Sequence, residues 1–419
     1  MNKYIVRGGK ELHGDVYISG MKNSALPVIF ASILTKSECI IENIPDVRDI
    51  SLSFDILETL GAEVTKLSPT SVRINTAPLN GRTAPYEQVS KMRGSSYLIG
   101  ALLGRFGESK VGWPGGCDFG TRPIDQHLKG FEALGANTFF DDGFINATAP
   151  DGLRGNSIYF DVVSVGATIN IIIAATLAQG VTVIENAARE PHVSDLANFL
   201  NACGADISGA GTASVRIRGV RELHGCTYKL VPDMIEAGTY MVAAAATGGC
   251  VNVHNVIPKH METVTAKLCE MGIGVDVHDN FITVTSDRIY NHVNIKTLPY
   301  PGFPTDMHPQ FGALLCLARG VSIITENIWE NRFKYTAELM KMGAVIDIDR
   351  NTAMISGVSE LHPARLHAAD LRAGAALIIA ALCADGESEI TGVESVERGY
   401  YRITDKLTAL GADIKKISD

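Results

Sequence analysis

The chain has 419 residues, of which 46% are hydrophobic and 20% are charged, and its formal net charge at pH 7 is −9. This length and composition suit two or three domains with full cores. The negative charge argues against nucleic acid as a partner, although a few Arg residues can still form a site for small anions. The first residues lack the apolar segment of a signal peptide, and the longest apolar runs are too short to span a bilayer. We therefore expect a cytoplasmic protein with no membrane partner.

A helix-like segment followed by Gly and a strand-like segment recurs six times along the chain. A Gly at the end of a helix favours a left-handed backbone, which explains the residue type. Successive glycines are 68 to 74 residues apart, and they are Gly61, Gly135, Gly204, Gly272, Gly343 and Gly411.

A second phrase repeats in register with the first. An apolar helix ends near a Gly and an alternating strand follows, at Gly107, Gly180, Gly249, Gly320 and Gly386, with Lys36 in the first unit. Helices that are apolar on all faces are typical of a buried layer. We therefore predict an α/β (α+β) protein with helices inside and sheets outside, in two halves of three units each. The alternative is six ordinary α/β segments with chance similarity.

The first two candidate site residues follow in chain order. Lys22 opens the first helix, where the helix dipole favours an anion beside it; the alternative is a solvated surface lysine. Cys117 lies in a loop with three Gly and two Pro between residues 114 and 124, close in sequence to Arg122, a setting that favours thiolate. The alternative for that loop is a structural turn.

The other seven cysteines lie in apolar or strand-like sequence, with no Cys-x-x-Cys pair and no neighbouring His cluster. We therefore expect neither a disulfide framework nor a zinc site.

Three more stretches are candidates. Residues 162–168 are mostly small and lead into a predicted helix. They either present backbone N–H groups to a phosphate or allow the helix to pack closely on a sheet. Asp306 follows two prolines and is either a general base or a helix N-cap. Matching places in the last two repeats hold Arg332, Arg372 and Arg398, which suggests a shared anion.

Together these stretches resemble the UDP-N-acetylglucosamine enolpyruvyl transferases over nearly the whole chain. The specific motifs are the Ser-Gly-x-Lys-Asn entry at 19–23, the Pro-Gly-Gly-Cys loop at 114–127, and residues 185–191, 304–307 and 330–333. The resemblance implies a two-domain inside-out α/β barrel with six βαβαββ-type units of about 70 residues. It places one domain at residues 22–229 and the other at 1–21 plus 230–419.

The resemblance also implies a reaction. The enolpyruvyl group of phosphoenolpyruvate would pass to the 3-hydroxyl of UDP-N-acetylglucosamine with release of phosphate, the first committed step of peptidoglycan synthesis. Cys117 would act as an acid and can form a covalent adduct with phosphoenolpyruvate, and Asp306 would take the proton of the sugar hydroxyl. No cofactor and no metal are implied.

The implied substrate contacts are as follows. Phosphoenolpyruvate would be held by Lys22, Asn23, Arg122, Arg332, Arg372 and Arg398. The UDP-sugar would be held by Arg93, Arg122, Pro123, Ile124, Asp125, Gln126, Val162, Val163, Ser164, Val165, Asp306 and Ile328.

Two positions depart from the pattern. Some relatives have Lys where Val162 stands and Arg where Met234 stands, so positive charge is lost near the nucleotide side. These departures keep another nucleotide as an alternative acceptor. Two further alternatives are shikimate 3-phosphate as the acceptor and a non-catalytic UDP-sugar-binding paralogue.

Overall fold

A computed structural model describes residues 2–115 and 123–418. The chain folds into two compact units, of which unit 1 comprises Met1–Ser19 with Pro232–Asp419 and unit 2 comprises Gly20–Val231. The chain passes from one unit to the other after Ser19 and again after Val231. Among the described residues, no helix has the length and apolar character needed to cross a membrane.

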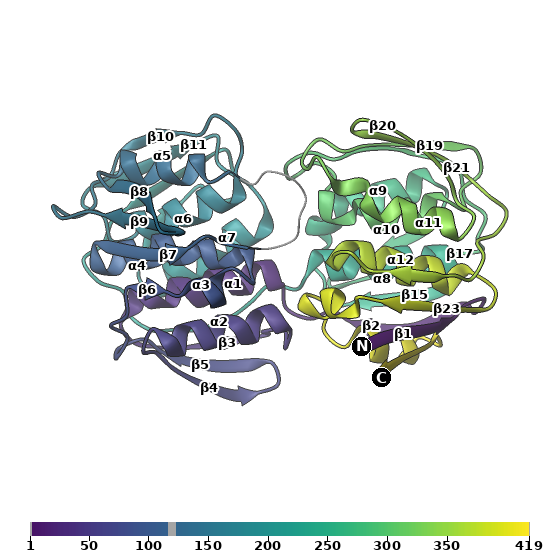
Figure 1. The fold of residues 1–419 in the computed structure, drawn as a ribbon, viewed down its shortest axis with the longest axis horizontal. Coiled ribbons are helices and arrows are strands. Elements are labelled where there is room, and N and C mark those ends of the chain that lie inside the picture. Colours follow the sequence, from purple (N-terminus) through teal and green to yellow (C-terminus); the bar gives the residue numbers. More distant parts are fainter. Residues whose placement is uncertain (1, 116–122, 419) are drawn as a thin grey trace. The chain divides into compact units, whose positions relative to one another are not determined.

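Unit 2 contains three four-stranded sheets and the helices between their strands (Figure 1). The labels η mark 3-10 helices. Its elements are α1 (Lys22–Ala31), η1 (Ser32–Thr35), β3 (Glu38–Glu42), α2 (Arg48–Thr59), β4 (Glu63–Ser68), β5 (Ser71–Asn75), β6 (Thr83–Ala84), α3 (Tyr86–Val89), η2 (Arg93–Ser96), α4 (Tyr97–Phe106), β7 (Glu108–Gly112), α5 (Asp125–Ala133), β8 (Asn137–Asp141), β9 (Phe144–Thr148), β10 (Ser157–Tyr159), α6 (Val165–Ala175), β11 (Val181–Glu185), α7 (Pro191–Ala202), β12 (Asp206–Ser208), β13 (Ser214–Arg218) and β14 (Thr227–Lys229).

Unit 1 has the same composition of three four-stranded sheets. Its elements are β1 (Asn2–Arg7), β2 (Leu12–Tyr17), α8 (Met234–Thr247), β15 (Gly249–His254), η3 (Pro258–Met261), α9 (Glu262–Glu270), β16 (Gly274–Val277), β17 (Phe281–Ser286), β18 (Asn294–Lys296), η4 (Thr305–Met307), α10 (His308–Leu315), β19 (Val321–Thr325), η5 (Arg332–Tyr335), α11 (Thr336–Lys341), β20 (Val345–Asp349), β21 (Thr352–Ser356), β22 (Arg365–His367), α12 (Leu371–Cys383), β23 (Glu387–Thr391), η6 (Val393–Arg398), α13 (Ile403–Ala409) and β24 (Asp413–Ser418).

All six sheets share one pattern, in which an edge strand pairs parallel with its neighbour and the other pairings are antiparallel. The strand orders are β14-β3-β5-β4, β6-β7-β9-β8 and β10-β11-β13-β12 in unit 2, and β16-β17-β15-β2, β18-β19-β21-β20 and β22-β23-β1-β24 in unit 1. Strands distant in sequence complete three of these sheets, as Figure 1 shows for β1 beside β23.

The repeat glycines have the backbone that the sequence predicts. The six that end helices have φ between 88° and 102°, and those of the second phrase have φ between 73° and 127°. Lys36, which replaces the second glycine in the first repeat, is left-handed as well, with φ 52°. The sixfold repeat is therefore confirmed in the backbone.

The helices form the core of each unit. Every residue of α8, α10 and α12 in unit 1 is buried, and these helices pack on one another. In unit 2, α4 packs on α6 and α1 on α7. Strands such as β11 and β13 are buried on alternate residues, because one face of the sheet packs on the helices. The predicted arrangement of helices inside and sheets outside is confirmed.

Candidate active site

The predicted site residues divide between the two units. Cys117 and Arg122 lie outside the described residues. Unit 2 carries Lys22, Asn23, Arg93, residues 123–126 and residues 162–165, and unit 1 carries Asp306, Ile328, Arg332, Arg372 and Arg398.

Lys22 is the first residue of α1 and forms a largely buried ion pair. Its Nζ lies 3.1 Å from Oδ2 of Asp49, and the two side chains are 13% and 5% exposed. The alternative of a solvated surface lysine is therefore wrong. Asp49 belongs to the first turn of α2, and the sequence prediction missed it. Its only signal in the sequence is an acidic residue near a helix start.

A buried carboxylate fixes the start of α1. Asp195 of α7 accepts a hydrogen bond from Ser24 Oγ and another from the Tyr228 hydroxyl at 2.5 Å. Burial raises the pKa of Asp195, and these donors oppose that effect. Because α1, α7 and the β14 segment meet at this carboxylate, Lys22 and the half-buried Asn23 begin a rigidly held helix.

The structure brings together two stretches that the resemblance assigns to the UDP-sugar. Gln126 of α5 donates from Nε2 to Oδ2 of Asp161 at 3.2 Å and accepts from the Asp161 N–H at 3.0 Å. Lys129 adds an ion pair to the same carboxylate at 2.8 Å. Residues 123–126 and 162–165 therefore lie next to each other. Val162 is 60% exposed, so its side chain is available to a ligand.

The starts of α5 and α6 pack closely at this place. Ser164 caps α6 by accepting from the Ala167 N–H at 3.3 Å, and a Cβ on Gly166 would lie 2.7 Å from Nε2 of His127. The small residues here therefore serve close packing, one of the two alternatives for this stretch. Burial, with help from the charge of Arg93, lowers the pKa of His127 to about 3, so the imidazole is neutral.

Asp306 lies in unit 1 between two buried arginines. Arg332 donates from one terminal nitrogen to Oδ1 at 3.2 Å, and Arg372 donates to Oδ2 from Nε at 3.2 Å and from a terminal nitrogen at 3.0 Å. The arginine side chains are 1% and 5% exposed, whereas that of Asp306 is 30% exposed. Among the residues that the structure describes, no side chain caps α10. The N-cap alternative for Asp306 is therefore wrong.

The surroundings of Arg372 keep it charged. Burial alone would lower its pKa, but the charges of Asp306 and of Asp233 and the contact with Tyr400 leave the pKa above its ordinary value. The guanidinium carbon lies 5.3 Å from the centre of the Tyr400 ring. Arg398 ends η6 two residues before Tyr400 and is half-buried. Unit 1 thus holds a carboxylate in contact with two buried arginines.

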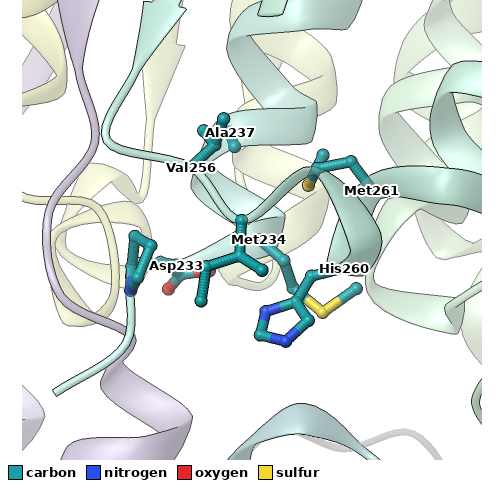
Figure 2. Close-up of a pocket in the computed structure, with 8 residues that line it drawn as sticks. Asp233, Met234, Ala237, Val256, His260 and Met261 are labelled. Carbon is teal, nitrogen blue, oxygen red and sulfur yellow. The ribbon is translucent and has the colours of Figure 1, made fainter. Parts of the chain in front are cut away.

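Met234 begins α8 and lines a shallow pocket of unit 1. Figure 2 shows it among Asp233, Val256, His260 and Met261. Only 8% of Met234 is exposed, and Asp233 caps the helix by accepting from two backbone N–H groups. Met234 therefore acts as a packing residue in this chain.

The structure describes seven of the cysteines, and all seven are free thiols. Six are buried or half-buried, but Cys269 on α9 is exposed, so the expectation of an apolar setting is wrong for Cys269. Within residues 2–115 and 123–418 there is no group of three or more His, Cys, Asp or Glu side chains suited to a metal ion.

Comparison with known proteins gives a consistent result. A family model described as EPSP synthase (3-phosphoshikimate 1-carboxyvinyltransferase) matches residues 6–407. UDP-N-acetylglucosamine 1-carboxyvinyltransferase 3 of Caldanaerobacter subterraneus subsp. tengcongensis is 54% identical over 419 residues, which is 100% of both chains. UDP-N-acetylglucosamine 1-carboxyvinyltransferase 2 of Clostridium acetobutylicum is 52% identical over 417 residues, 99% of each chain.

Solved structures share the fold. The enolpyruvyl transferase NikO from Streptomyces tendae superposes with a TM-score of 0.91 at 26% identity, covering 100% of this chain and 99% of its own. An EPSP synthase from Acinetobacter baumannii superposes with a TM-score of 0.79 at 18% identity over 100% of both chains, which bears on the fold alone. The expected fold class is therefore confirmed.

Proposed function

The chain belongs to the EPSP synthase family, and within it to the UDP-N-acetylglucosamine 1-carboxyvinyltransferases, and we propose from this premise what it does. It transfers the enolpyruvyl group of phosphoenolpyruvate to the 3-hydroxyl of UDP-N-acetylglucosamine and releases phosphate. This reaction is the first committed step of peptidoglycan synthesis. The observation that carries the proposal is identity of 52–54% to relatives of that name over 99–100% of the chain.

In the proposed reaction, unit 1 supplies the base. Asp306 takes the proton of the sugar 3-hydroxyl, and the oxygen then attacks the second carbon of phosphoenolpyruvate. Arg332 and Arg372 are held at Asp306 and are buried, so they are placed to bind the substrate carboxylate with little loss of side-chain entropy. Arg398 contacts the phosphate of phosphoenolpyruvate instead, as Arg122 does.

Unit 2 supplies the phosphate site and the acid. Lys22 with Asn23 binds the phosphate at the start of α1, and Arg122 adds a second cation. Cys117 gives a proton to the methylene carbon, which becomes a methyl group in a tetrahedral intermediate. The Cys117 thiolate then takes back a proton from that methyl group, which restores the double bond and expels phosphate. The same thiol can instead bond to phosphoenolpyruvate as a covalent adduct.

The UDP-sugar is bound by the adjoining stretches 123–126 and 162–165, with Arg93, Asp306 and Ile328. The exposed Val162 gives this nucleotide surface an apolar side chain in place of a charge. The reaction uses no cofactor and no metal in this proposal. We place the enzyme in the cytoplasm, because its two substrates are products of cytoplasmic metabolism.

Acceptor dependence tests the proposal. Phosphate release from phosphoenolpyruvate is measured with UDP-N-acetylglucosamine, with shikimate 3-phosphate, with UMP and with no acceptor. We expect release only with UDP-N-acetylglucosamine. Equal release with shikimate 3-phosphate or with UMP would identify another acceptor. Binding of the UDP-sugar without release by any acceptor would identify a non-catalytic paralogue.

A further inference from the structure

We propose that Glu326 is a positioning residue for this reaction, whose buried carboxylate holds the turn carrying Asp306 and the loop carrying Ile328 in one fixed arrangement. The inference rests on the function proposed above and deepens it. Glu326 is not among the residues to which the sequence or the resemblance assigns a role.

One oxygen of Glu326 organises the loop between β19 and η5. Oε1 accepts from the Ile328 N–H at 2.8 Å, from the Trp329 N–H at 3.2 Å and from the Thr297 hydroxyl at 2.8 Å. Two backbone N–H groups of one loop are thereby fixed to the end of β18. The loop position of Ile328, a proposed contact of the UDP-sugar, therefore depends on this oxygen.

The other oxygen organises the turn that carries the base. Oε2 of Glu326 accepts from the Thr305 hydroxyl at 2.9 Å and faces Nδ1 of His308 at 2.8 Å. The Thr305 carbonyl in turn accepts from Arg332 at 3.3 Å, and Arg332 also donates to Asp306. The residue before Asp306 is thus held at its hydroxyl and at its carbonyl.

The Glu326–His308 pair is wholly buried, with both side chains 0% exposed. Burial would raise the pKa of Glu326, but the hydrogen bond from His308 and the other donors outweigh it and leave the pKa lowered. Burial lowers the pKa of His308 below its ordinary value. The hydrogen bond and charge of Glu326 and the charge of Asp370 oppose this, and the charge of Arg332 adds to it. Because both pKa values are lowered, Glu326 is ionised and the His308 imidazole is neutral. The imidazole then donates from its Nδ1–H to the carboxylate.

The internal repeat shows that the Asn contact at this strand end forms without a buried Glu. In three other repeats, an Asn directly follows the equivalent strand and its amide donates to the carbonyl just after the parallel edge strand. These bonds are Asn43 to Leu230 at 2.9 Å, Asn186 to Phe160 at 2.9 Å and Asn255 to Ile18 at 2.6 Å.

The β18–β19 repeat makes the same bond one residue later. Asn327 donates from Nδ2 to the Thr297 carbonyl at 3.1 Å, and Glu326 lies between the end of β19 and this Asn. Glu42 and Glu185 also directly precede the Asn of their repeats, but each is the last residue of its strand and is exposed or half-buried. Buried ion pairs and charges contribute little net stability compared with apolar packing. A Glu that is exposed or half-buried before the Asn of two other repeats, but wholly buried here beside the proposed base, therefore points to a role in the site.

The test compares Glu326→Gln and Thr305→Val with a matched control, Glu338→Gln. Glu338 lies in the same unit, accepts from the His367 N–H at 3.0 Å and pairs with Lys341. Turnover is expressed per active site, counted by covalent labelling of Cys117, and each unfolding midpoint is recorded. Misplacing reacting groups by a fraction of an ångström lowers kcat strongly, so we expect a loss of about tenfold to a hundredfold for Glu326→Gln. The control should stay within about twofold.

A double variant supplies the readout that a merely stabilising role would not move. Because Glu326→Gln and Thr305→Val break the same hydrogen bond, their combination should be no more than about twofold below the worse single variant, and Thr305→Ser should restore turnover. If Glu326→Gln does not fold, Thr305→Val alone should show the tenfold loss per labelled site. Unchanged turnover per labelled site in the folded variants, or effects that multiply, would overturn the inference. If the inference is overturned in this way, turnover by the wild-type protein in the same assay still upholds the proposed function. Absence of turnover by the wild-type protein would refute the proposed function and the inference with it.

Discussion

Asp306→Asn removes the charge that two buried arginines share. The amide can still accept from one arginine, but its NH2 group then faces the N–H donors of the other. The wild-type carboxylate receives three N–H contacts of 3.0–3.2 Å. Removing one partner of a buried pair costs about 3–5 kcal/mol, and solvent at the 30% exposed Asp306 brings this toward about 3 kcal/mol. For a unit of about 200 residues, such a loss lowers the unfolding midpoint by about 6–12 °C.

The same variant loses the proposed base. We expect kcat to fall by about 10²–10⁴-fold, the usual contribution of a general base, while the KM for phosphoenolpyruvate does not rise, because Arg332 and Arg372 keep their charge. Those uncompensated cations should also bind inorganic phosphate, so phosphate should raise the unfolding midpoint of the variant more than that of the wild type.

The assay measures phosphate release with saturating UDP-N-acetylglucosamine and thermal unfolding with and without phosphate. Asp347→Asn on the exposed face of β20 is the matched control and should leave both unchanged. A kcat within threefold of the wild type for folded Asp306→Asn would refute the assignment of Asp306 as the base. An unchanged midpoint would refute the account of the arginine pair.

Three other changes test separate parts of the structure. Lys22→Met should raise the KM for phosphoenolpyruvate about tenfold or more in steady-state kinetics, because one charge-assisted contact to phosphate is lost; an unchanged KM would remove Lys22 from the phosphate site. Burial lowers the pKa of His127 to about 3 in the folded state. Below about pH 6.5 the unfolded chain therefore binds more protons than the folded chain. As the pH decreases from there, the free energy of unfolding falls by up to about 1.4 kcal/mol per pH unit. Denaturant titrations at pH 7, 6 and 5 should show a shallower fall for His127→Gln, and equal slopes would contradict this burial. Lys36→Gly should raise the free energy of unfolding by about 0.5–1 kcal/mol, because the left-handed backbone at φ 52° suits Gly; Lys36→Ala is the control without that gain, and a loss of stability in Lys36→Gly would contradict the reason given.

The sequence predicted those features that local chemistry determines. A left-handed helix end needs Gly whatever surrounds it, so six glycines at a period of about 70 residues predicted the repeat and its backbone. Helices that are apolar on all faces predicted a helical core, since no other layer could cover them. Lys22 at a helix start followed from the motif in the same way.

The partners of the charged residues could not be predicted from spacing. Asp49 pairs with Lys22 and Asp161 with Gln126 from different elements, and Asp195 reaches Ser24 across 171 positions in the chain. Such contacts are set by tertiary packing, which leaves no local period in the sequence. For the same reason the N-cap alternative for Asp306 could be rejected only from the structure.

Glu326 lies between these two cases. The sequence shows a Glu directly before an Asn at 42–43, 185–186 and 326–327, so it marks the position but does not distinguish Glu326. The hydrogen bonds and the burial show that in this repeat the Asn contact is made one residue later and that the Glu side chain is buried. The contact between residues 123–126 and 162–165 could not be predicted from either stretch alone. It depends on the hydrogen bond between the Gln126 and Asp161 side chains, which only the structure shows.

Identification of the product tests the central claim most directly. The purified protein is incubated with phosphoenolpyruvate and UDP-N-acetylglucosamine, and the nucleotide product is analysed by mass spectrometry and NMR. We predict one product, UDP-N-acetylglucosamine with an enolpyruvyl ether on its 3-oxygen, formed together with one phosphate. An unmodified UDP-sugar after prolonged incubation, or an enolpyruvyl group on any other atom, would contradict the account.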